Sequence, residues 1–161
     1  MDISDFRDLY LKELQEARSV ENQLVEALPR MKQTARDPDL KQAIDDHLGE
    51  TRAQLERIET ILDRYGADPS EHEDQSMKRL IDEGEKWAGM LDGALRDAAL
   101  IASAQRIEHY EIAVYGTLAS WAKQLGEDED LDALLATLDE EKGADEGLTE
   151  LAKREVNPSA Q

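Results

Sequence analysis

Seven residues with metal-ligand side chains interrupt apolar stripes that repeat at helical spacing. They are Glu21, His47, Glu50, Glu108, Glu111, Glu141 and Asp145. Alternating steps of three and four residues keep one face of a helix toward its neighbours, and four segments of the chain carry such a stripe. Burying an unpaired carboxylate is costly or forces it to take up a proton. Carboxylates and imidazole are ligands that iron and manganese accept, so the pattern predicts a metal site.

The strongest pair is Glu108 and Glu111, which lie three residues apart on the apolar face of the segment AQRIEHYEIAVYGTL. Glu141 and Asp145 lie four residues apart on the last stripe. With a rise of about 1.5 Å per residue, the polar residues of each predicted helix hairpin fall within roughly one to two turns of each other. The spacing therefore predicts one shared polar layer in the middle of a helical bundle.

Each of these residues also has a purely structural interpretation. Glu21 could be an edge residue paired with Arg18, and His47 could be a core histidine bonded to a carboxylate. Glu50 lies on the edge of its stripe, so its assignment depends on the spacing to His47. The last helix is acidic throughout, which leaves an exposed face as the alternative for its two candidates. His72 is expected to be exposed to solvent, and His109 is expected at the surface or in a dimer contact.

The chain is expected to be all-α, because no segment alternates with period two and helix-forming residues abound. We predict helices at about 4–35, 38–65, 75–87, 90–126 and 130–154. Asp37 and Gly66 are the expected caps of the second helix. Pro29 should kink the first helix or break its hydrogen-bond ladder. The tail after about residue 154 is expected to fray.

The predicted connections indicate a ferritin-like four-helix bundle. Short turns join the first two and the last two long helices, whereas a link of roughly 25 residues with a short fifth helix can run the length of the bundle. One long crossover of this kind is typical of ferritin-like folds. At 161 residues the chain should form a single domain, residues 1–161.

Composition excludes several functional classes. The formal charge of −19, from 38 acidic and 19 basic residues, argues against nucleic acid or an anionic membrane as a partner. The chain has no cysteine, so disulfides and thiolate metal sites are excluded. There is no apolar leader and no run of about 18 apolar residues, so we expect a cytoplasmic protein.

Four segments resemble the YciF-like stress proteins, a branch of the ferritin-like superfamily: EARSVENQLVEALPRM, HLGETRAQLERIETIL, AQRIEHYEIAVYGTL and LDEEKGADEGLTELA. The resemblance covers nearly the whole chain, from about Phe6 to Lys153. It implies a ferritin-like helical bundle, a homodimer and a carboxylate metal site.

The sequence departs from the common di-iron pattern of Glu-x-x-His on two of the helices. The second helix has the reversed order His47-x-x-Glu50, and position 53 is Ala53. In the last helix, Ala144 stands three residues after Glu141. Only one candidate histidine is left, so standard ferroxidase activity does not follow from the pattern.

Two functions fit these observations. The first is a di-metal carboxylate protein, with iron favoured and manganese possible, that reacts with oxygen or hydrogen peroxide during stress. The alternative is a non-enzymatic dimeric stress protein whose polar layer is structural and metal-free. A mini-ferritin cage would share the fold, but nothing in the sequence predicts one.

Overall fold

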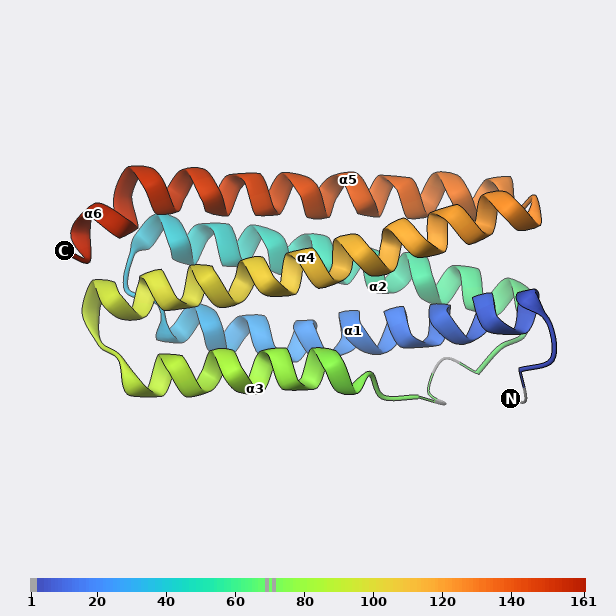
Figure 1. The fold of residues 1–161 in the computed structure, drawn as a ribbon, viewed down its shortest axis with the longest axis horizontal. Coiled ribbons are helices and arrows are strands. Elements are labelled where there is room, and N and C mark those ends of the chain that lie inside the picture. Colours follow the sequence, from blue (N-terminus) through green and yellow to red (C-terminus); the bar gives the residue numbers. More distant parts are fainter. Residues whose placement is uncertain (1–2, 69, 71) are drawn as a thin grey trace.

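The computed structural model describes residues 3–68, 70 and 72–161, and its regular structure over this part of the chain is entirely helical. Four long helices form the bundle: α1 (Phe6–Thr34), α2 (Pro38–Tyr65), α4 (Gly93–Leu125) and α5 (Asp128–Leu151). The shorter α3 (Gln75–Met90) packs on α4 and α1 (Figure 1). The predicted fold class, a ferritin-like four-helix bundle with a fifth helix in the crossover, is confirmed. None of the described helices is long and apolar enough to cross a membrane.

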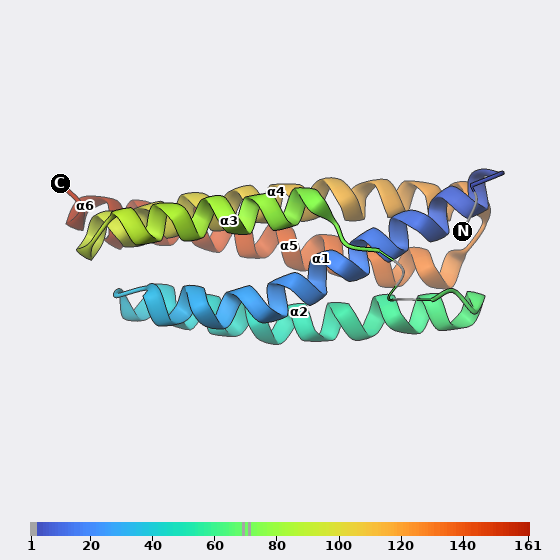
Figure 2. The same ribbon diagram turned by 90° about the horizontal axis from the view of Figure 1, so that it is seen from below.

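The connections follow the predicted topology. Short turns join α1 to α2 and α4 to α5, so each pair forms an antiparallel hairpin. The link between α2 and α4 contains α3 and runs back along the bundle (Figure 2). The two hairpins contact each other through α1 with α4 and through α2 with α5. Residues of both hairpins therefore meet in the interior.

Local capping explains where the helices begin and end. The Asp37 side chain accepts the N–H groups of Asp39 and Leu40, as predicted for the N-cap of α2. Gly66 and Gly126 end α2 and α4 at φ values of 63° and 75°, a left-handed conformation that favours glycine. These caps fix where α2 begins and where α2 and α4 end.

The C-terminal tail differs from the sequence-based expectation. After α5 the chain continues as a π-helical turn, η1 (Ala152–Val156), and a short helix, α6 (Asn157–Ser159). Val156 is buried in the same apolar cluster as Leu100 and Leu148, which gives the tail a packing partner and removes the reason for fraying. Pro29 lies within α1, which continues to Thr34, so the proline does not end the helix.

The apolar core is divided into two clusters along the bundle axis. One contains Leu24, Ile44 and Leu148, and the other contains Leu14 and Leu134. On each long helix, buried polar residues lie between the positions that belong to the two clusters. The bundle thus has a polar layer in its middle, as the spacing predicted.

Candidate metal centre

Four of the seven predicted ligand residues converge in this layer. His47 of α2, Glu108 and Glu111 of α4, and Glu141 of α5 each offer one ligand atom, and these atoms all lie within 4.8 Å of one another. All four residues are buried. The fold therefore brings one imidazole and three carboxylates together from both hairpins.

Glu21 supplies a fourth buried carboxylate, from α1. It is completely buried, and its Oε1 accepts a hydrogen bond from the hydroxyl of Tyr115. Burial and the nearby charge of Glu141 raise the pKa of Glu21 well above its usual value. Glu21 lies outside the group of four, but it belongs to the same polar layer because its charge interacts with that of Glu141.

The other two predicted ligands lie at the edge of the layer. The Glu50 side chain is half exposed, and its Oε2 lies 3.5 Å from Nδ1 of His47. Asp145 accepts a hydrogen bond of 3.1 Å from Gln105 and lies 3.5 Å from Nε2 of His109. These contacts keep Asp145 beside the exposed His109 rather than within the group of four.

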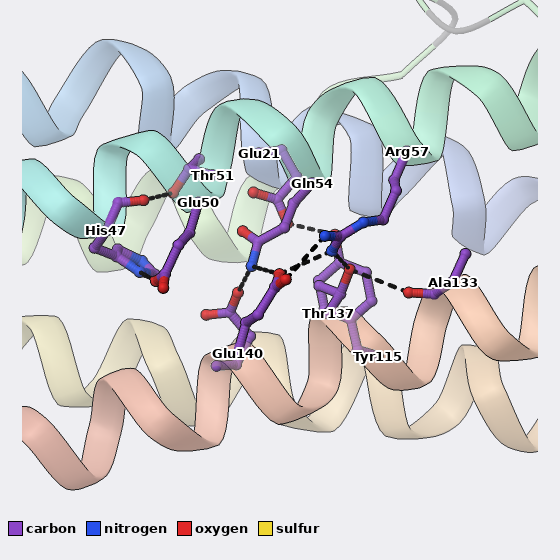
Figure 3. Close-up of polar contacts among 11 residues, drawn as sticks. Glu21, His47, Glu50, Thr51, Gln54, Arg57, Tyr115, Ala133, Thr137 and Glu140 are labelled. Atoms are coloured by element: carbon purple, nitrogen blue, oxygen red, sulfur yellow. Dashed lines mark hydrogen bonds and ion pairs between the residues drawn. The ribbon is translucent and has the colours of Figure 1, made fainter.

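A buried glutamine and an arginine also contact the layer, and the sequence did not reveal either role (Figure 3). Gln54 Nε2 donates to Glu141 and, at 3.0 Å, to Glu140. Arg57 in turn donates to both carboxylate oxygens of Glu140 at 2.8 Å. Thr51 and Gln54 are buried on the inner face of α2. The apolar pattern of the sequence had placed Leu55 on that face, but Leu55 is only partly buried.

The layer contains an unusual number of buried polar atoms that find no hydrogen-bond partner among the described residues. They include both carboxylate oxygens of Glu111, Oε2 of Glu21, Glu108 and Glu141, and both ring nitrogens of His47. His47 Nε2 lies 3.4 Å from Oε1 of Glu108 without forming a hydrogen bond. Buried polar groups are normally paired, so this cluster has free capacity to bind a ligand.

Burial is the main cause of the raised pKa values in the layer. It raises the pKa of Glu108 and Glu111 well above the usual range, and the charge of Glu141 raises both further. The pKa of Glu141 is also raised by burial, although the charge of His47 opposes the shift. These carboxylates can lose their protons together only if positive charge takes the protons' place.

The donor set of His47, Glu108, Glu111 and Glu141 could hold a metal ion. The carboxylates of this group and of nearby Glu21 are negatively charged when ionised, so a bound cation would offset their repulsion. Oxygen ligands with one imidazole suit iron or manganese. The absence of cysteine from the chain is consistent with this hard donor set.

Comparisons with known proteins agree with the fold and cover almost the whole chain. The domain of unknown function DUF892 matches residues 5–161. The protein YciF of Escherichia coli is 38% identical over 163 residues, which cover 100% of this chain and 98% of YciF. The crystal structure of this stress protein superposes with a TM-score of 0.91 at 38% identity, covering 96% of this chain and 99% of YciF.

Two further solved structures are similar. YcfI of Rhodopseudomonas palustris has a TM-score of 0.88 at 40% identity, covering 92% of this chain and 95% of its own. A protein of Xanthomonas campestris has a TM-score of 0.76 at 23% identity, with 92% of each chain covered. At that identity the second likeness bears on the fold alone.

Proposed function

The chain belongs to the DUF892 family of YciF-like stress proteins, and from that premise we propose that its buried acidic layer binds two metal ions, iron before manganese. The observation that carries the proposal is Glu111. Both of its carboxylate oxygens are buried and unpartnered, and it lies in the group with His47, Glu108 and Glu141. Such a group is stable when ionised only beside cations.

The residues of the layer divide into ligands and residues that orient them. His47, Glu108, Glu111 and Glu141 would hold the metal, with Glu21 as the carboxylate from α1. The Tyr115 hydroxyl fixes one oxygen of Glu21 and leaves the other free. Gln54 does the same for Glu141. Glu50, next to His47, and Asp145, one turn from Glu141, are the two predicted ligands at the edge.

A bound iron pair would supply redox chemistry with oxygen or hydrogen peroxide, and we propose that this is the role of the protein in stress. The chain itself contributes a buried environment between two apolar clusters, in which the carboxylates of Glu111 and Glu141 are completely buried. The expectations of a cytoplasmic location and of a homodimer belong to this proposal. Sedimentation would distinguish a dimer from a monomer or a cage.

Metal stoichiometry tests the proposal. The protein is reconstituted anaerobically with ferrous iron or manganese, and the bound metal is measured by elemental analysis, with about two ions per chain expected. Glu111→Ala should lose most of the metal, whereas Asp145→Ala, a matched change at the edge of the layer, should retain it. Equal metal content in the wild type and Glu111→Ala would contradict the proposal.

A metal-free structural role is the second candidate. The hydrogen bonds from Tyr115 to Glu21 and from Gln54 to Glu141 favour it, because they pair part of the layer without any ion. In that case the polar layer would fix the register of the helices, and the dimer would act through partners on its acidic surface. A melting temperature that neither metal nor chelator changes would support this candidate, since a ligand of the folded state raises it.

A further inference from the structure

A partly enclosed cavity of about 370 Å³ lies directly beside the polar layer. Its walls come from all four long helices, and His47 and Glu108 are part of its lining. The cavity therefore connects the surface of the bundle with two of the residues that form the candidate metal centre.

The lining of the cavity has two chemically different parts. Leu28, Ile44 and Leu148 form an apolar wall, which small residues of α5 extend. Three carboxylates, those of Asp46, Glu50 and Asp139, lie at exposed positions on its rim. The cavity thus combines an apolar interior with an acidic opening.

Buried polar atoms mark the inner end of the cavity. His47 is 7% exposed and Glu108 is 2% exposed. The two ring nitrogens of His47 and Oε2 of Glu108 find no hydrogen-bond partner in the described part of the chain. An apolar cavity that ends on such atoms differs from a packing defect, because these atoms lack the partners that buried polar groups normally have.

Size and charge together define the class of ligand. A water molecule occupies about 30 Å³ in the liquid, and oxygen and hydrogen peroxide are of similar size, so this cavity is about ten times larger than those oxidants require. Its volume falls within the range of small organic ligands. Carboxylates at the rim repel anions and attract cations, and the net charge of −19 adds to this preference.

We infer that the cavity binds a small apolar amine. The ammonium group lies at the opening beside the exposed carboxylates of Asp46 and Asp139, and the apolar chain lies against Ile44 and Leu148, directed toward Glu108. That the amine is a substrate rests on the proposed function, because a metal ion in the polar layer would face the methyl end of the bound amine. Binding itself requires only the cavity and its rim.

The test uses hexylammonium, hexanol and hexanoate, three probes of equal length and different charge. Binding to the full-length, metal-free protein is measured by ligand-observed NMR. We expect the amine to bind more tightly than the alcohol and the alcohol more tightly than the carboxylate. Equal or tighter binding of hexanoate would overturn the charge assignment, and binding of none of the probes would overturn the site.

Gly147→Leu provides a variant that places a larger side chain at the wall of the cavity. Gly147 is a wall residue on α5, and an added Cβ would meet no atom within 4 Å. We expect the variant to weaken hexylammonium binding by at least about tenfold, because the new side chain occupies the space of the ligand. Gly49→Leu, at an exposed glycine of α2 outside the lining, is the matched control and should bind normally. Equal binding by Gly147→Leu and the wild type would overturn the proposal.

Loading with manganese tests the orientation and separates this inference from the proposed function. In manganese-loaded protein the terminal methyl protons of hexylammonium should relax faster than those beside the ammonium group, and the reverse order would overturn the orientation. Metal uptake without amine binding would refute the cavity inference alone. Amine binding that depends on Gly147, in a protein that takes up no metal, would refute the proposed function alone.

Discussion

Two buried acidic sites in this bundle differ in whether their carboxylate oxygens have hydrogen-bond partners. Near the end of the bundle, Asp130 accepts hydrogen bonds from the hydroxyls of Tyr10 at 2.9 Å and Tyr65 at 2.7 Å, and it pairs with Arg64. In the middle, Glu111 is equally buried, but neither of its oxygens has a partner in the described structure. The first carboxylate is part of the folded framework, whereas the second has free coordination capacity.

Other buried carboxylates follow the pattern of Asp130. Asp97 accepts the backbone N–H groups of Arg36 and Asp37 at 2.8 and 2.9 Å, and so ties the first hairpin turn to α4. Asp74 caps α3 and accepts the Tyr110 hydroxyl at 2.7 Å. Since this chain pairs its structural carboxylates, unpartnered oxygens in the central layer indicate a site that awaits cations or protons.

The largest expected effect separates the two sites by stability. Asp130→Ala leaves the buried Tyr10 hydroxyl without its acceptor, removes the acceptor of the partly buried Tyr65 hydroxyl, and leaves Arg64 with only Glu129 of its two carboxylate partners. We expect the free energy of unfolding to fall by about 2 to 4 kcal/mol, less than for a fully buried pair because Arg64 is partly exposed. Urea denaturation measures the loss, and metal stoichiometry should be unchanged. A loss of metal as complete as in Glu111→Ala would show that the two sites are not independent.

The pH dependence of the metal-free protein should reveal the unpartnered site. Burial raises the pKa of Glu108 and Glu111 above the ordinary value of 4.5, so the folded protein binds more protons than the unfolded chain above that pH. Their contribution to stability is present below pH 4.5 and is lost as the pH rises. We expect the free energy of unfolding to fall as the pH rises from 5 to 8, measured by urea denaturation.

The double variant Glu108→Gln/Glu111→Gln is the control for that experiment. It should flatten the pH dependence, because an amide does not titrate in this range. Bound metal should reverse the slope in the wild type, since ligand carboxylates must lose their protons. A metal-free wild type that becomes more stable, relative to the double variant, as the pH rises would contradict the assignment.

Glu111→Gln should raise the free energy of unfolding of the metal-free protein, whereas Asp130→Ala should lower it. An amide of the same shape replaces a buried acid that must hold its proton, so the metal-free variant should be more stable than the metal-free wild type at pH 8. The same variant should lose the rise in melting temperature that metal gives the wild type. Thermal melts with metal and with chelator measure both effects, and a destabilised metal-free variant would place Glu111 with the framework carboxylates.

Tyr115→Phe should have the smallest effect on stability. It tests whether Glu21 is a framework carboxylate like Asp130 or an unpaired carboxylate like Glu111. It removes the hydroxyl that donates to Glu21, and Glu21 then has no described partner for either oxygen. We expect the metal-free protein to lose about 0.5 to 1 kcal/mol, measured by urea denaturation. A larger loss, comparable with that of Asp130→Ala, would show that Glu21 is a framework residue.

Sequence patterns predicted the fold well because its determinants are local. Capping by Asp37 and Gly66, the apolar stripes and the long crossover depend on residues close together in the chain. The C-terminal tail was not predicted, because burial of Val156 depends on contacts with distant segments. Periodicity does not report contacts of that kind.

The candidate site was predicted in position more accurately than in detail. The stripes located the layer on each helix, but Gln54 was missed because Leu55 is the more apolar neighbour. Asp145 lies on the predicted stripe, yet its contacts with Gln105 and His109 hold it at the edge. Side-chain partners across helices decide such cases, and a single sequence does not show them.

The division into two hairpins also has a consequence for the order of folding. Contacts within a hairpin join residues close in sequence and form early, whereas contacts between hairpins close longer loops. Glu21 and His47 come from the first hairpin, and Glu108, Glu111 and Glu141 come from the second. Docking of the hairpins brings their ionised carboxylates together and increases the repulsion between them, so a divalent ion that offsets this repulsion should accelerate docking and slow the separation of the two halves.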